Sequence, residues 1–222
     1  MLKSISFGNC EFSTYILIIG LAFLLAFIIF FRLIKKSLSK IDILYIYVIN
    51  IIGFAIGAKM LSLISNEKIL SLYNIINSGY SYLGGIIGSS MFIALYCYKY
   101  TLNIKDILAT FSVLFPLIYS VCKLGCFLNN CCSGIIIFPL QLVDSGIMLL
   151  LFFILLLQYQ KNKRYLISKF LIGFSITRFL EDYYRYYRKV IAYNLTLEQI
   201  ICIAFICMGV FGICLEKNKK AI

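Results

Sequence analysis

Seven apolar segments dominate this chain, each close to the ~20 residues that an α-helix needs to cross the ~30 Å hydrocarbon core of a bilayer. Of its 222 residues, 62% are hydrophobic and only 14% are charged, which is more apolar surface than a soluble domain can bury. We therefore predict an all-α fold, a polytopic membrane helix bundle that forms one domain over residues 1–222. The seven predicted transmembrane helices are Tyr15–Phe31, Ile43–Ile64, Tyr82–Tyr98, Ile107–Leu124, Leu140–Gln158, Leu166–Phe179 with its flanks, and Ile200–Leu215.

Basic residues gather in alternate connections between these segments. They follow the first, third and fifth segments and recur in the C-terminal tail, whereas the other connections hold fewer basic residues or balance them with acidic ones. The positive-inside rule then predicts that the N-terminus lies outside and the C-terminus inside. On this topology the net charge of +12 reflects mainly cytoplasmic loops beside anionic lipid, and no nucleic-acid partner is expected.

Several charged residues lie within the apolar segments, all toward the predicted outer ends. A charge in hydrocarbon costs at least ~2.5–3.5 kcal/mol, so such residues usually mark a site. Lysine and arginine here are suited to a lipid phosphate, with the aspartates orienting them or acting as bases. The alternative is a set of interhelical ion pairs and snorkelling side chains. For the set as a whole we favour a site: Lys59, Lys123, Asp144, Arg178, Asp182 and Arg185.

Polar and small residues beside these charges suggest further contacts. Gly84 and Gly85 open the third segment, where they either pack helices closely or bare backbone N–H groups that bind anions. Asn129, in an otherwise apolar stretch, needs a polar partner that a lipid head group would supply. Gln141 and Asp144 place an amide and a carboxylate one turn apart.

Taken in order, these segments resemble the prolipoprotein diacylglyceryl transferase family over nearly the whole chain. Tyr15 is similar to the family's tyrosine at the start of the first span. Arg178, Asp182 and Arg185 resemble its Arg-x-x-x-Glu-x-x-Arg pattern. The other matching segments are Gly57-Ala58-Lys59-Met60, Gly84-Gly85-Ile86-Ile87-Gly88, Lys123 through Gly134, Pro139 through Asp144, and Leu195 through Gln199.

The resemblance implies an enzyme of the bacterial cell membrane. Its members transfer a diacylglyceryl group from phosphatidylglycerol to the lipobox cysteine thiol of a prolipoprotein, forming a thioether. On this basis the catalytic candidates are Asp144, Asp182 and Arg178. The candidate substrate-binding residues are Tyr15, Lys59, Gly84, Gly85, Lys123, Asn129, Gln141 and Arg185.

The chain has no histidine, and Leu83 stands where family members often carry one, so a histidine base is excluded. The remaining base candidates are Asp144, Asp182 and an oxygen of the substrate phosphate. Two other functions stay open: a non-catalytic homologue that binds anionic lipid or a peptide, and a thiol–disulfide protein. The second would use the cluster Cys122, Cys126, Cys131 and Cys132, whose spacing is not that of a metal site; no metal or other cofactor is expected.

Overall fold

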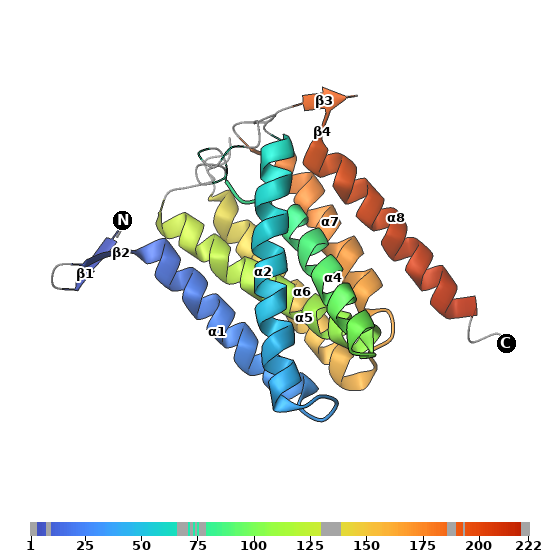
Figure 1. Cartoon of the computed structure of the whole chain (residues 1–222). Helices are drawn as coiled ribbons and strands as arrows, with labels where there is room; N and C mark the ends of the chain where they lie inside the picture. Colours follow the sequence, from blue (N-terminus) through green and yellow to red (C-terminus); the bar gives the residue numbers. More distant parts are fainter. Residues whose placement is uncertain are drawn as a thin grey trace. The chain divides into compact units, whose positions relative to one another are not determined.

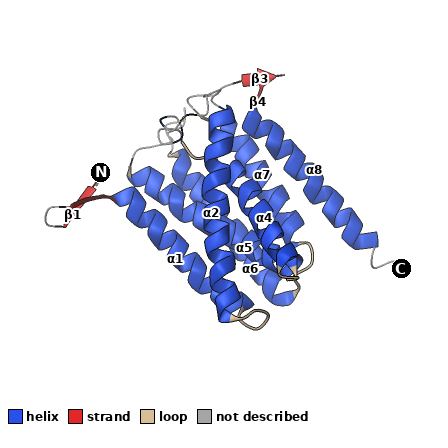
Figure 2. Cartoon of the chain, in the orientation of Figure 1, coloured by secondary structure: helices blue, strands red, loops and turns tan. Residues whose placement is uncertain are grey.

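Seven long helices dominate the computed structural model of the chain (Figures 1 and 2). The residues that it describes are 4–7, 10–65, 71, 73, 75, 79–129, 139–185, 190–192 and 194–218. The prediction of an all-α class is confirmed, and each predicted segment coincides with a helix. The helices are α1 (Thr14–Ile34), α2 (Lys40–Ser65), α4 (Tyr82–Lys99), α5 (Ile104–Leu128), α6 (Leu140–Lys161), α7 (Leu166–Tyr183) and α8 (Leu197–Asn218).

Two short antiparallel hairpins, which the sequence did not predict, precede the first and last helices. Strand β1 (Ser4–Phe7) pairs with β2 (Cys10–Ser13), and β3 (Val190–Ala192) pairs with β4 (Leu195–Thr196). Figure 1 shows β4 leading directly into α8, so this hairpin fixes where the last helix begins.

Within the described residues, five helices are long and apolar enough to cross a membrane: α1, α2, α5, α6 and α8. Helix α7 is less apolar because it carries Lys169, Arg178, Glu181 and Asp182. Helix α4 has only 18 residues, among them glycines, serines and tyrosines that lower its hydropathy. Large apolar side chains such as Ile16, Leu150 and Phe211 remain more than 60% exposed on helix faces, as expected of lipid-facing surface. The full set of seven spans and the orientation of the termini stay predictions.

The chain divides into two compact units, which are described separately. The first comprises Met1–Phe30 and Ala109–Ile222, and the second comprises Phe31–Leu108. In the second unit, glycines bring the backbones of α2 and α4 together: a Cβ on Gly84 would lie 2.4 Å from the carbonyl oxygen of Gly57, and one on Gly88 would lie 2.4 Å from that of Gly53. Close approach of this kind is how small residues pack membrane helices.

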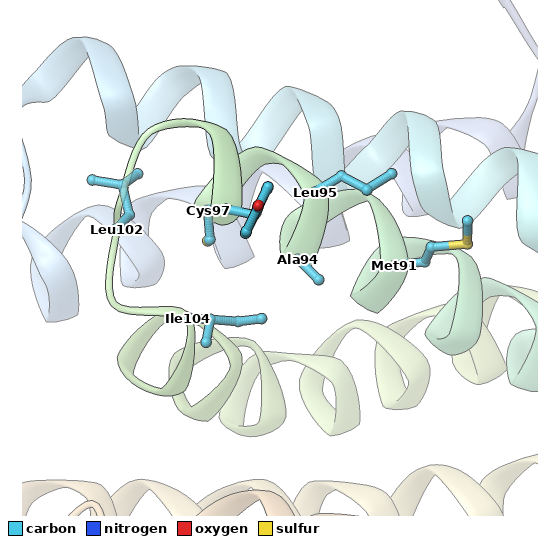
Figure 3. A pocket seen from close by; sticks show the side chains of 7 residues that line it. Met91, Ala94, Leu95, Cys97, Leu102 and Ile104 are labelled. Carbon is cyan, nitrogen blue, oxygen red and sulfur yellow. The ribbon is translucent and has the colours of Figure 1, made fainter.

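A shallow apolar hollow lies on the second unit at the end of α4. Figure 3 shows Met91, Ala94, Leu95 and Cys97 along the helix, with Leu102 and Ile104 completing the wall from the residues that follow. No charged side chain lines the hollow. Tyr98 also lines the hollow, and the rest of the lining is apolar.

Helix α5 is the most buried of the five apolar helices in the described residues, because 83% of its most hydrophobic 18-residue stretch is buried, against 17–33% for the others. Phe111 stacks on Phe30 of α1, with ring centroids 4.6 Å apart. Toward α6, Ser120 and Ser145 exchange hydrogen bonds: each hydroxyl donates to the other residue's carbonyl oxygen, at 2.9 and 3.0 Å. These contacts fix α5 against α1 and α6. The last turns of α5 contribute residues to the candidate site described below.

Candidate functional site

A buried network of charged side chains lies at one end of α5, α6, α7 and α8. Helices α5 and α7 reach it near their last turns, whereas α6 and α8 contribute residues from their first turns. All of these residues belong to the first unit, and they are called the charge cluster below. Its members are Tyr119, Lys123, Asp144, Arg178, Glu181, Asp182, Arg185 and Glu198.

Glu181 is at the centre of the charge cluster. One of its carboxylate oxygens pairs with Lys123 Nζ and the other with Arg178 Nη1. Lys123 Nζ also lies 2.7 Å from Asp144 Oδ2. These four side chains are at most 4% exposed, so helices α5, α6 and α7 are joined by ion pairs in the interior.

The phenol of Tyr119 lies among the same groups. Its Oη is 2.8 Å from Asp144 Oδ2 and 2.9 Å from Glu181 Oε2, and it accepts a hydrogen bond from Arg178 Nη1 at 3.1 Å. The ring packs edge-on against Phe174, with centroids 5.5 Å apart. Tyr119 lies one helical turn before Lys123, so both side chains project from the same face of α5.

Helix α8 completes the cluster through its first turn. Arg178 Nη2 donates to Glu198 Oε2 at 2.6 Å, and Arg185 Nη1 donates to the same oxygen at 3.2 Å. The Arg185 and Glu198 side chains are 29% and 18% exposed, so the cluster becomes accessible on the side of α8.

A capping box fixes the position of Glu198. The Thr196 N–H donates to Gln199 Oε1 at 3.1 Å, and the Gln199 N–H donates to Thr196 Oγ1 at 3.2 Å. This reciprocal pair satisfies backbone donors at the start of a helix. The Thr196 hydroxyl in turn donates to Asp182 Oδ2 at 2.7 Å, which ties the start of α8 to the end of α7.

The structure therefore brings together five of the residues singled out in the sequence: Lys123, Asp144, Arg178, Asp182 and Arg185. Each of these charges has an oppositely charged partner within 4 Å, across helices for Lys123, Asp144, Arg178 and Arg185 and at the end of α7 for Asp182. Ion pairing and a functional site are compatible, since site residues also need fixed positions.

Three further predicted residues lie near the same helix ends. Tyr15, at the start of α1, contacts α5, where its Oη is 3.9 Å from Cys126 Sγ. Gln141 is buried one turn before Asp144 on α6. Asn129 follows the last turn of α5, and its side-chain Nδ2 is buried without a partner among the described residues.

The other three predicted residues belong to the second unit. Lys59 Nζ lies 4.2 Å from the ring centroid of Tyr80, a cation–π contact. Gly84 and Gly85 pack against α2, where a Cβ on Gly85 would lie 2.3 Å from the Phe54 ring, and the Gly85 N–H donates to the Ser81 carbonyl oxygen at 3.0 Å. This geometry favours the helix-packing interpretation of both glycines; their role in substrate binding stays a prediction.

Tyr119, Glu181 and Glu198 are the cluster members that were not among the predicted site residues. Glu181 could have been identified from the sequence, because it lies three residues after Arg178 and therefore shares its helix face. In the sequence, Glu198 resembles the acidic residues that commonly occur in the first turn of a helix, so it did not point to a site. Of the predicted cysteine cluster, Cys122 and Cys126 are buried on α5, and Cys131 and Cys132 lie outside the described residues.

Comparison with known proteins identifies one family. A family model described as prolipoprotein diacylglyceryl transferase matches residues 3–215. Three relatives are each named phosphatidylglycerol–prolipoprotein diacylglyceryl transferase. The Clostridium tetani protein is 24% identical, and the match covers 84% of this chain and 85% of that protein. The Campylobacter hominis and Campylobacter curvus proteins are 29% and 26% identical, and the matches cover 64% and 63% of this chain but 58% and 59% of those proteins.

Proposed function

The chain belongs to the prolipoprotein diacylglyceryl transferase family, and from that premise we propose that it transfers a diacylglyceryl group from phosphatidylglycerol to the lipobox cysteine thiol of a prolipoprotein. The observation that carries this proposal is the pair of buried cations, Lys123 and Arg178, held at one end of α5 and α7. A charge at this depth costs at least ~2.5–3.5 kcal/mol, a cost that a purely structural role rarely justifies.

The two cations suit a phosphodiester because each retains a donor. The Lys123 ammonium has three N–H groups, and Asp144 and Glu181 account for two of them. Arg178 Nε is buried without a partner among the described residues, although both of its terminal nitrogens are paired. We assign these donors to the phosphate of the lipid, with the buried Asn129 Nδ2 as a further donor.

The proposed reaction is a displacement at carbon. The thiol sulfur forms a bond to the glyceryl CH₂, and the C–O bond to phosphate breaks with its electron pair going to the phosphate oxygen. Glycerol phosphate leaves, and the thiol proton must be taken up. Cations that hold the departing phosphate act where negative charge develops, which is the arrangement that lowers such a barrier.

Asp144 is the better of the two aspartate candidates for proton exchange. Its Oδ1 is buried and has no partner among the described residues. Asp182 is instead engaged by the Thr196 hydroxyl at the start of α8. We therefore assign Asp144 to proton exchange with the reacting groups and Asp182 to positioning, with Arg185 and Gln141 contacting the head group.

We further propose that seven helices cross the bacterial plasma membrane, with the N-terminus outside and the C-terminus inside. On that topology the charge cluster lies toward the outer leaflet. The lipid and the signal peptide of the acceptor would both reach it by diffusion within the membrane. The basic connections on the opposite side support this orientation.

A direct assay tests the proposal. The purified protein in phosphatidylglycerol-containing nanodiscs is given a lipobox peptide, and the peptide is analysed by mass spectrometry for a thioether-linked diacylglycerol. Lys123→Ala and Arg178→Ala should abolish the product. Lys169→Ala is the matched control, because that lysine is exposed at the other end of α7. If the wild-type protein binds the lipid but forms no product, the transferase proposal is wrong and the non-catalytic lipid-binding alternative takes its place.

A further inference from the structure

The hydroxyl of Tyr119 lies between two carboxyl groups in the buried part of the charge cluster. Tyr119 is 2% exposed, and its Oη is 2.8 Å from Asp144 Oδ2 and 2.9 Å from Glu181 Oε2. Both separations are within the range of O–H···O hydrogen bonds. The same oxygen accepts the N–H of Arg178.

These contacts require more protons than the phenol can supply. A phenol has one O–H, and ionised carboxylates are acceptors only. With both carboxylates ionised, one of the two contacts would therefore place a carboxylate oxygen against an oxygen lone pair. A single O–H shared between both carboxylates gives two weaker, bent hydrogen bonds, whereas two full hydrogen bonds form if one of the carboxyl groups carries a proton that it donates to Tyr119 Oη.

Asp144 is the carboxyl group better suited to carry this proton. Glu181 pairs with both Lys123 and Arg178, and its Oε1 is 3.9 Å from Arg185 Nε. Within the described part of the chain, the one ion-pair partner of Asp144 is Lys123. The ionised form of Glu181 is thus stabilised by more positive charge than that of Asp144.

The charge balance of the cluster leads to the same conclusion. Among the described residues, the groups facing one another are three cations and four carboxyl groups, an excess of one acidic group. Unbalanced charge is disfavoured in the buried part of the cluster, and one proton on a carboxyl group removes this excess. The groups are Lys123 of α5, Asp144 of α6, Arg178, Glu181, Asp182 and Arg185 of α7, and Glu198 of α8.

We propose that Tyr119 holds a proton shared between Asp144 and Glu181, so that the resting charge cluster stores one proton. The use of this proton rests on the proposed function. Asp144 gives it to the phosphate oxygen as the C–O bond breaks, and the acceptor thiol returns a proton to Asp144 as the S–C bond forms. The exchange is balanced and needs no histidine. Tyr119 is a positioning residue in this scheme, because it acts through Asp144.

Infrared spectroscopy of the full chain in nanodiscs tests the stored proton without any reaction. A protonated carboxyl group gives a C=O stretch that an ionised one lacks. We expect this band at neutral pH, with a shift when the protein is grown on aspartate labelled with ¹³C at its side-chain carboxyl carbon. The band should be lost in Asp144→Asn and shifted in Tyr119→Phe. Tyr159→Phe is the matched control, because that buried hydroxyl bonds Thr110 Oγ1 at 3.1 Å, outside the cluster.

The outcomes separate the stored proton from the reaction. A wild type without the band, or a band that Asp144→Asn and Tyr119→Phe leave unchanged, overturns the shared proton even if lipid transfer is observed. A wild type with the band but no transfer leaves the shared proton standing and overturns the proposed function. In an active protein, Tyr119→Phe should slow transfer by at least about 10-fold, whereas Tyr159→Phe should not.

Discussion

Replacing Lys123 with methionine tests whether the buried ion pairs form in the folded protein. The substitution keeps an unbranched side chain of similar length but removes the ammonium that lies 2.7 Å from Asp144 Oδ2 and also pairs with Glu181. At a separation of about 3 Å, the Coulomb energy of the ion pair with the ionised Glu181 is about 5–6 kcal/mol for an effective dielectric constant of ~20. Desolvation offsets much of it, and removing one partner of a buried pair typically costs ~3–5 kcal/mol.

We therefore expect Lys123→Met to lower the free energy of unfolding by ~3–5 kcal/mol. The measurement is a denaturing-detergent titration followed by circular dichroism. Lys169→Met is the control, because Lys169 Nζ bonds Gln158 Oε1 at an exposed position and its loss should change stability by less than ~0.5 kcal/mol.

A second substitution locates the charge that Lys123 neutralises. If Asp144 carries a proton, replacing Lys123 with methionine mainly removes positive charge from beside the ionised Glu181. Lys123→Met with Glu181→Gln should then recover more stability than Lys123→Met with Asp144→Asn, by about 1 kcal/mol or more. A loss below ~0.5 kcal/mol for Lys123→Met alone would refute the reasoning, because a buried ammonium pairing two carboxyl groups cannot be removed at so small a cost.

The remaining predictions concern the two neighbouring acidic residues, the helix contact in the second unit and the start of α8. Glu181→Gln should reduce transfer by at least about 10-fold in the mass-spectrometric assay, since Glu181 holds both buried cations; Asp182→Asn, equal in charge change, should reduce it less. Gly84→Ala places a methyl group 2.4 Å from a backbone carbonyl oxygen and should destabilise the protein by ~1–3 kcal/mol in a detergent titration. Gly20→Ala, with nothing within 4 Å, should be neutral or stabilising; equal losses would contradict the packing contact. Thr196→Ala removes the helix cap and the bond to Asp182, and should cost ~0.5–2 kcal/mol by the same titration, whereas Thr196→Ser should restore most of it.

The helices could be predicted because the apolar segments are long and their ends are polar. The meeting of three of the charges could be predicted from the same pattern: Lys123 lies near the end of one helix, Asp144 near the start of the next, and Arg178 near the end of the third. The short hairpins were missed because strands of two to four residues carry too little periodicity to be recognised.

The partners of each charge could not be predicted in the same way. Positions three and four after Arg178 share its helix face, so spacing alone did not distinguish Glu181 from Asp182. The family pattern favoured Asp182, but contacts from α5 place Glu181 at the centre. Tyr119 lies in an apolar segment where a tyrosine is ordinary, and only the approach of α6 and α7 gives its hydroxyl two carboxyl neighbours.

The most direct test of the central claim is the mass of a lipobox peptide after incubation with the purified wild-type protein and phosphatidylglycerol. The account predicts a thioether-linked diacylglycerol on the cysteine, present with Lys169→Ala and absent with Lys123→Ala. An unmodified peptide, from wild-type protein that is folded and retains bound phosphatidylglycerol, would contradict it.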